Sequence, residues 1–141
     1  MPTMPTSRWR GAAAVDVTAV ALFVVIGRAS HRHAETVAGI ASTAWPFAVG
    51  LGTGWAFLAA LGRRRGARLD PSSLSSGAAV CATTVACGMT LRVVAGQGTA
   101  PTFTGVATGF LGALMVGGRA ALGAATRRRR DPAQRGAERG G

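Results

Sequence analysis

The chain has 141 residues, of which 48% are apolar, and it contains 21 glycines in addition. It also carries sixteen basic residues against five acidic ones, which gives a net charge of +11. A soluble domain has an apolar share, glycine included, of about 45–50%. This composition therefore argues against an ordinary soluble enzyme and against disorder throughout the chain. A chain that is both more apolar and more basic than average must separate the two properties along its length.

Four apolar runs follow a polar leader over residues 1–10. The runs cover residues 11–27, 37–62, 74–96 and 100–121. Crossing a hydrocarbon core of roughly 30 Å takes about 20 apolar residues in a helix, and each run is long enough. The period-two alternation that is typical of barrel strands is absent. The sequence therefore predicts an all-α, four-helix transmembrane bundle over residues 11–125, followed by a basic, disordered tail over residues 126–141.

The first run follows Arg8 and Arg10, as the apolar core of a secretory signal would. Its apolar stretch is long for such a signal, it carries Asp16, and no clean small-x-small cleavage site follows it. A retained first helix is the better interpretation.

Arginines are unevenly distributed between the two ends of the predicted bundle. With the N-terminus inside, twelve arginines lie in cytoplasmic segments, whereas Arg28, Arg32 and Arg92 lie on the outer side. The positive-inside rule therefore predicts that both chain ends face the cytoplasm of a bacterium, with the protein in its inner membrane as a multi-pass protein. Anionic lipid headgroups are the expected partners of the arginine clusters. The tail has no aromatic residue to stack on bases, so nucleic acid is not an expected partner.

Small residues recur at every fourth position of the last two runs. They are Gly105, Gly109, Ala113 and Gly117 in one run and Ala78, Ala82 and Ala86 in the other. Helices associate in lipid through close contact between small side chains, and only residues 96–99 join these two runs. The pattern therefore predicts that helices 74–96 and 100–121 form a tight antiparallel hairpin. In the second run, Pro46 predicts a kink, with Ser42 or Thr43 available to satisfy the carbonyls that it frees.

Three ionisable residues lie inside the apolar runs: Asp16, Arg92 and Arg119. Each costs at least about 2.5–3.5 kcal/mol in hydrocarbon, so each is a candidate functional residue. From the helical rise, Asp16 and Arg92 differ in depth by more than about 10 Å, whereas Asp16 and Arg119 both lie toward the inner ends of their helices. We therefore predict an Asp16–Arg119 pair, and we expect Glu35 or the carbonyls near Gly96 to face Arg92. Structural pairing is favoured over a proton or substrate path.

A polar cluster is expected at the outer rim of the bundle, formed by Arg28, His31, Glu35 and Gln97. An extended H-x-H pair such as His31 and His33 could ligate a metal together with Glu35. Two arginines in the same loop would oppose a cation, so a hydrated interfacial loop is the favoured interpretation. No metal and no cofactor is predicted.

Several short segments resemble a known family. They are Asp16, Gly27-Arg28-Ala29-Ser30-His31, Ala44-Trp45-Pro46-Phe47, Gly88-Met89-Thr90-Leu91-Arg92 and Gly96-Gln97-Gly98-Thr99. In this order they resemble a bacterial membrane family that is typical of actinobacteria and is catalogued as a domain of unknown function, type 3054. The resemblance covers roughly residues 15 to 120. It implies a small four-helix membrane protein and supplies no established activity, so no catalytic role is carried over.

The chain lacks the signatures of catalysis. No nucleophile–base pair, metal motif or glycine-rich phosphate loop is present, so an enzyme is not expected. The predicted function is an integral membrane protein that acts as a small transport or channel-like component. Four helices leave little room for a private pathway, so this component would act as an oligomer. The alternative is a non-catalytic structural or assembly partner of another membrane protein.

Overall fold

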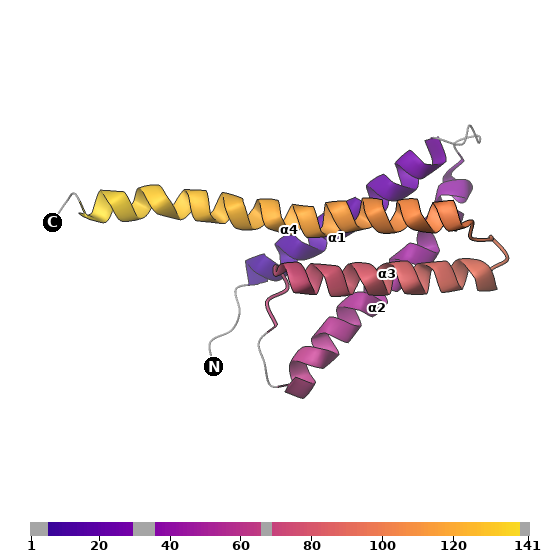
Figure 1. Cartoon of the computed structure of the whole chain (residues 1–141), viewed down its shortest axis with the longest axis horizontal. Coiled ribbons are helices and arrows are strands. Elements are labelled where there is room, and N and C mark those ends of the chain that lie inside the picture. Colours follow the sequence, from indigo (N-terminus) through magenta and orange to yellow (C-terminus); the bar gives the residue numbers. More distant parts are fainter. Residues whose placement is uncertain (1–5, 30–35, 66–68, 139–141) are drawn as a thin grey trace.

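The structure is a computed structural model that describes residues 6–29, 36–65 and 69–138. This part of the chain forms four helices: α1 (Thr6–Ala29), α2 (Val37–Arg65), α3 (Leu74–Val94) and α4 (Pro101–Glu138) (Figure 1). Each helix contains a segment that is long and apolar enough to cross a membrane. These segments are Arg8–Gly27, Val37–Arg64, Leu74–Val94 and Pro101–Ala125. The predicted all-α architecture with four transmembrane helices is confirmed.

The four helices pack in a ring. α1 lies against α2 and α4, and α3 also lies against α2 and α4. α3 and α4 run side by side in opposite directions, although the most extensive contact is the one between α2 and α3 (Figure 1). The first residues of α1 and the last residues of α4 lie toward the same end of the bundle (Figure 1). We call this the basic end, because Arg8, Arg10, Arg63 and Arg64 lie there.

The α2–α3 contact is close because glycines let the two backbones approach. A Cβ atom on Gly50 would lie 2.6 Å from the carbonyl oxygen of Thr84, and one on Gly54 would lie 3.1 Å from that of Val80. These two glycines are four residues apart and therefore share one face of α2. A face of this kind lets helices associate in lipid through backbone-level packing, and here it joins α2 to α3.

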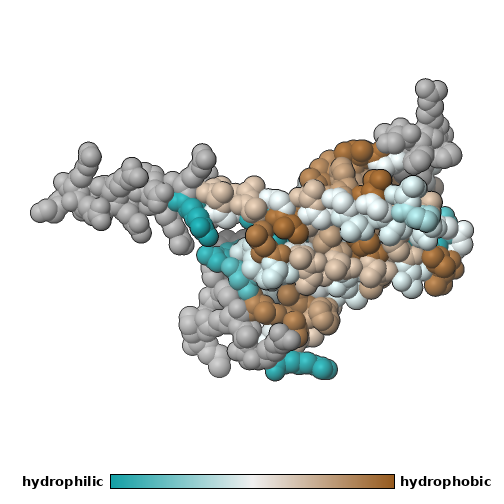
Figure 2. All heavy atoms as spheres, in the orientation of Figure 1, coloured by the Kyte–Doolittle hydropathy of each residue, from teal (hydrophilic) through white to brown (hydrophobic). Residues whose placement is uncertain are grey.

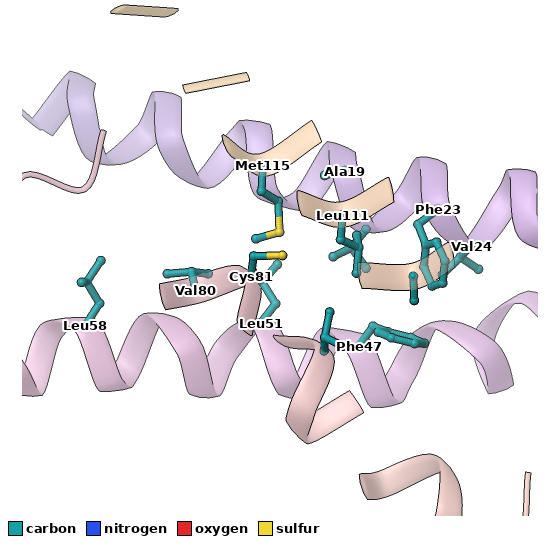
Figure 3. Packing of buried hydrophobic residues seen from close by; sticks show 13 residues of the cluster. Ala19, Phe23, Val24, Phe47, Leu51, Leu58, Val80, Cys81, Leu111 and Met115 are labelled. Atoms are coloured by element: carbon teal, nitrogen blue, oxygen red, sulfur yellow. The ribbon is translucent and has the colours of Figure 1, made fainter. Parts of the chain in front are cut away.

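Large apolar side chains fill the centre of the ring. They include Phe23, Val24, Phe47, Leu51, Val80, Leu111 and Met115 (Figure 3). The ring of Phe47 packs edge-on against that of Phe23, with centroids 5.0 Å apart. A Cβ atom on Gly88 would lie 2.8 Å from the Phe47 ring, so the glycine provides the space for it. The ring centroid of Phe103 lies 5.8 Å from that of Phe23. Aromatic contacts therefore connect α1, α2 and α4.

The outer surface of the bundle is apolar along the helices. Val17, Val25, Phe57, Val94 and Val106 have exposed fractions between 48% and 79%. Figure 2 shows brown and pale residues along the helices, with teal residues toward their ends. Soluble proteins rarely expose apolar surface on this scale. The chain is a multi-pass membrane protein whose exposed apolar side chains face lipid.

Helices α1 and α4 extend beyond the limits expected from the sequence. α1 begins at Thr6, inside the segment predicted as a polar leader, and α4 continues to Glu138 through a tail that was predicted to be disordered. Six of residues 126–141 are arginine, which has a high helix propensity. An existing helix also adds residues without a new nucleation step. The structure thus describes α4 as continuing through the tail as far as Glu138.

Candidate functional site

A buried ion pair joins α1 to α4 near the basic end. Asp16 and Arg119 are 0% and 1% exposed. Arg119 Nη2 donates a hydrogen bond to Asp16 Oδ2 at 2.8 Å, and Arg119 Nη1 donates to Asp16 Oδ1. Two parallel N–H···O bonds are the strongest and most directional form of an arginine–carboxylate contact. The predicted pairing of Asp16 with Arg119 is confirmed.

Arg119 also bonds to backbone carbonyls on two sides. Its Nε donates to the carbonyl oxygen of Pro71 at 3.0 Å, and its Nη1 donates to that of Met115 at 3.1 Å. The side chain passes close to α3 at Gly77, where a Cβ atom would lie 2.7 Å from Arg119 Cδ. A larger residue at this position would collide with the arginine. Arg119 therefore connects α1, α4 and the segment that precedes α3.

The position of Arg119 follows from the register of α4. The buried residues Ala107, Leu111, Met115 and Arg119 recur at every fourth position, so the arginine continues the face that points to the centre of the bundle. Because Asp16 has no exposed surface and accepts two bonds from Arg119, it presents no open position to a transported proton or ion. The arrangement is a crosslink that fixes the register of α1 against α4.

A second ion pair, which sequence reasoning did not identify, lies at the basic end. Arg8 Nη1 donates to Asp70 Oδ2 at 3.0 Å, while Ser72 N donates to Asp70 Oδ1 at 2.9 Å. Partial burial alone would raise the pKa of Asp70. The hydrogen bonds from Ser72 and the guanidinium of Arg8 outweigh this effect and hold the pKa below its ordinary value. The run Asp70-Pro71-Ser72 signals a helix start but gives no indication of a partner in α1.

Two consecutive hydrogen bonds at the opposite end of the bundle connect α3 to α2. Arg92 Nη1 donates to Gln97 Oε1 at 3.1 Å, and Gln97 Nε2 donates to the carbonyl oxygen of Ser42 at 3.0 Å. Ser42 lies four residues before Pro46, so its carbonyl is the one that the missing proline N–H leaves without a helical partner. Gln97 therefore supplies from outside α2 the hydrogen bond that Pro46 cannot make.

The prediction that Ser42 or Thr43 would satisfy the freed carbonyls was wrong for the Ser42 carbonyl. The hydroxyl groups of both residues donate instead to the carbonyl oxygen of Gly39, at 2.9 Å and 3.1 Å. A serine or threonine hydroxyl in a helix reaches the carbonyl three or four residues earlier. It therefore bonds one turn before the carbonyl that Pro46 frees, which leaves that carbonyl to Gln97.

The turn between α3 and α4 holds Gln97 in place. Gly96 and Gly98 have φ angles of 68° and 71°, a left-handed conformation that favours glycine. Gln97 N donates to the carbonyl oxygen of Arg92 at 2.9 Å, as in a Schellman C-cap. The guanidinium of Arg92 also lies 4.7 Å from the centroid of the Phe103 ring, a cation–π contact to α4. Arg92 is thus held by α4 and by the turn.

Replacing Gln97 by leucine is expected to lower the free energy of unfolding by about 0.5–1.5 kcal/mol, because the Ser42 carbonyl loses its donor. The loss is measured by thermal unfolding of the purified chain in detergent. In a Pro46→Ala background, the alanine N–H can bond the Ser42 carbonyl, and the effect of Gln97→Leu should become smaller. An equal loss in both backgrounds would show that Gln97 does not compensate for the proline.

The predicted outer-rim cluster falls largely outside the described residues. His31 and Glu35 lie outside them, as does the side chain of Arg28, whose backbone belongs to α1. Gln97 is described and bonds to Arg92 and Ser42. Within the described ranges, no group of three or more histidine, cysteine, aspartate or glutamate residues could hold a metal ion.

The small-residue stripes of α3 and α4 do not pack these two helices together. All of their members are exposed: Gly105, Gly109, Ala113 and Gly117 on α4, and Ala78, Ala82 and Ala86 on α3. A Cβ atom on Gly105, Gly109 or Gly117 would meet nothing within 4 Å. The prediction that these residues form the α3–α4 contact was therefore wrong.

The residues that face the centre are offset by two positions from each stripe. On α4, the buried Leu111 lies two residues after the stripe residue Gly109. On α3, the buried Thr84 lies two residues after the stripe residue Ala82. Two residues correspond to about 200° of rotation, so each stripe lies on the opposite side of its helix from the core. The centre of a four-helix ring is wide, and large side chains are needed to fill it to the density of a protein interior.

Comparison with known proteins gives a family match. The family described as protein of unknown function (DUF3054) matches residues 13–122. The matched segment contains the Asp16–Arg119 pair and Gln97. No curated protein and no solved structure matches the chain.

Proposed function

This chain belongs to the DUF3054 family of proteins of unknown function, and we propose that it is a non-catalytic membrane protein that works as an assembly of identical copies. The proposed contact is the α3–α4 face, which we define by its exposed small residues. These are Ala78, Ala82, Ala86, Gly105, Gly109, Ala113 and Gly117. In a twofold dimer, the glycine stripe of one copy would lie on the alanine stripe of the other.

The α3–α4 face has open space along its exposed glycines, and this space supports the proposed assembly. Gly105, Gly109 and Gly117 leave room for another backbone to approach. Figure 2 shows a mainly pale surface where α3 and α4 lie in Figure 1. Small residues drive helix association in lipid, because apolar burial gives no gain there. The same chemistry, through Gly50 and Gly54, already packs α2 on α3 within one copy.

The intramembrane charges favour assembly over a pathway through a single copy. Asp16 and Arg119 are buried and bonded to each other, and Arg92 is bonded to Gln97. A transport or channel-like pathway would therefore run between copies, so it would exist only in the oligomer. The other proposed occupant of the α3–α4 face is a different membrane protein, and the experiment below separates the two.

We also propose an orientation and a location for the protein. Both termini face the cytoplasm, and the protein resides in the cytoplasmic membrane of a bacterium. This proposal rests on the arginine distribution, since the basic end holds Arg8, Arg10, Arg63 and Arg64, and basic residues remain on the cytoplasmic side during insertion.

Replacing Gly109 by leucine is expected to weaken assembly at least about tenfold, a change of about 1.4 kcal/mol. The wild-type chain should form dimers whose fraction rises with protein density in liposomes, as counted by single-molecule photobleaching. Because a Cβ atom at Gly109 meets nothing within 4 Å, and leucine favours a helix more than glycine does, the thermal unfolding temperature of Gly109→Leu should not fall.

Gly52 supplies the matched control. It is also exposed, and a Cβ atom there also meets nothing within 4 Å, but it lies on α2. Gly52→Leu should leave the dimer fraction unchanged. Equal weakening by the two substitutions would contradict the assignment of the contact to the α3–α4 face. A wild-type chain that stays monomeric at every density would contradict self-assembly and would favour another membrane protein as the partner.

A further inference from the structure

A groove of about 760 Å³ opens at the basic end between α1, the start of α3 and α4. One part of its lining is polar and includes Arg8, Asp70, Ser72 and Arg127. Another part is apolar and includes Leu74 and Leu122, together with small residues. The lining of the groove therefore combines charged and polar side chains with apolar ones.

The groove lies where three membrane-spanning segments reach their limits. The apolar span of α1 begins at Arg8, that of α3 begins at Leu74, and that of α4 ends at Ala125. Residues at the ends of spanning helices lie at the level of the lipid headgroups. The charged and polar lining residues are thus placed at the depth of a phosphate group, whereas Leu122 lies inside the apolar span of α4.

The electrostatic balance of the lining is positive. Arg8, Arg119 and Arg127 line the groove, and Asp70 is the acidic residue among its lining. Arg8 uses Nη1 to bond Asp70, which leaves other N–H groups of its guanidinium for an additional acceptor. Arg119 is neutralised by Asp16, so Arg8 and Arg127 are the residues that an anion would contact.

The apolar lining residues distinguish a lipid from a small anion. Leu74 and Leu122 are 52% and 39% exposed, and Ala120, Gly123 and Ala124 also line the groove. A free phosphate ion gains nothing from apolar lining residues, whereas a phospholipid uses both parts of the lining. We propose that the groove binds one anionic phospholipid, with its phosphate at Arg8 and Arg127 and an acyl chain along Leu74 and Leu122.

This inference goes beyond the proposed assembly and does not depend on it, because no residue of the α3–α4 face lines the groove. Its test is a titration of the full chain in detergent with dioleoyl-phosphatidylglycerol, followed by native mass spectrometry, with dioleoyl-phosphatidylcholine as the neutral reference. One phosphatidylglycerol molecule should bind with higher affinity than phosphatidylcholine. In the double variant Arg8→Gln/Arg127→Gln, the dissociation constant for phosphatidylglycerol should rise about fivefold for each arginine removed.

The double variant Arg10→Gln/Arg63→Gln is the matched control, because it removes two exposed arginines from the same end outside the groove. It should leave the first binding constant within about twofold of wild type, since a screened charge outside the site contributes little. Asp70→Asn should act in the opposite direction and tighten binding, because it frees Arg8 from its carboxylate. Equal weakening by both double variants would mean general attraction to basic charge and would overturn the site. Displacement of the lipid by millimolar inorganic phosphate would assign the groove to a free anion instead.

Discussion

Replacing Asp16 by asparagine is expected to lower the free energy of unfolding by about 3–5 kcal/mol, because it leaves the Arg119 guanidinium charged and without a counter-ion inside the bundle. The carboxylate accepts one bond at each oxygen from Arg119, whereas the asparagine amide offers one acceptor and turns a donor toward the arginine. Unfolding of the purified chain in mixed detergent–SDS micelles measures the change.

Arg127→Gln provides the control for this experiment. It also removes a charge, from the same end of the bundle and from the helix that carries Arg119, but at an exposed position. Exposed substitutions usually change stability by less than about 0.5 kcal/mol. If Asp16→Asn has an effect as small as that of Arg127→Gln, the buried pair does not hold α1 against α4.

Gly50→Ala is expected to destabilise the bundle by about 1–3 kcal/mol, as overpacking in a well-packed interior does. The added Cβ atom would lie 2.6 Å from the carbonyl oxygen of Thr84 and 3.2 Å from the backbone nitrogen of Gly88. Both contacts are with backbone, which cannot rotate away as a side chain can. The helices α2 and α3 must therefore move apart, and the thermal unfolding temperature should fall.

Gly52→Ala separates this contact from helix propensity. Gly52 lies two residues further along α2, where an added Cβ atom meets nothing within 4 Å. Because alanine favours a helix more than glycine does, this variant should be as stable as wild type or slightly more stable. Equal destabilisation by the two variants would be inconsistent with close packing of α2 on α3 at Gly50.

The sequence was sufficient to predict the features that depend on the length of the apolar runs and on the depth of charged residues in the membrane. Four apolar runs of spanning length have few alternatives to helices in lipid, because every backbone group needs an internal partner. The depth of Asp16 and Arg119, counted from the ends of their helices, was also enough to predict that they meet. The same large free energy, the cost of an unsatisfied polar group in hydrocarbon, favours both the helical spans and the buried pair.

The packing faces could not be predicted in the same way. The stripe through Gly105 and Gly109 satisfies the rule for helix association, but the rule does not say which partner the stripe meets. The packing of four helices around one centre decides this, and it places Leu111 and Met115 inside instead. Gly50 and Gly54 follow the same rule and do pack within the chain. Spacing alone therefore cannot separate an internal contact from a surface contact.

The polar contacts between residues far apart in the chain could also not be predicted from the sequence. Gln97 meets the Ser42 carbonyl across 55 positions of the chain, and Arg8 meets Asp70 across 62. Both depend on how the helix ends are placed in the ring, which no local pattern encodes. The helical continuation of α4 to Glu138 depends on propagation from the transmembrane segment, whereas the composition of the tail alone resembles that of a disordered segment.

The direct contact between Asp16 and Arg119 holds α1 against α4, and a double-mutant cycle measures its strength. The variants Asp16→Leu, Arg119→Met and their combination are compared with wild type by unfolding in SDS micelles. Each single substitution leaves one buried charge, whereas the combination leaves none, and apolar replacement of a buried pair is often neutral. The double variant should therefore be more stable than either single one, with a coupling energy of about 2 kcal/mol or more. Additive losses would contradict a direct interaction between the two side chains.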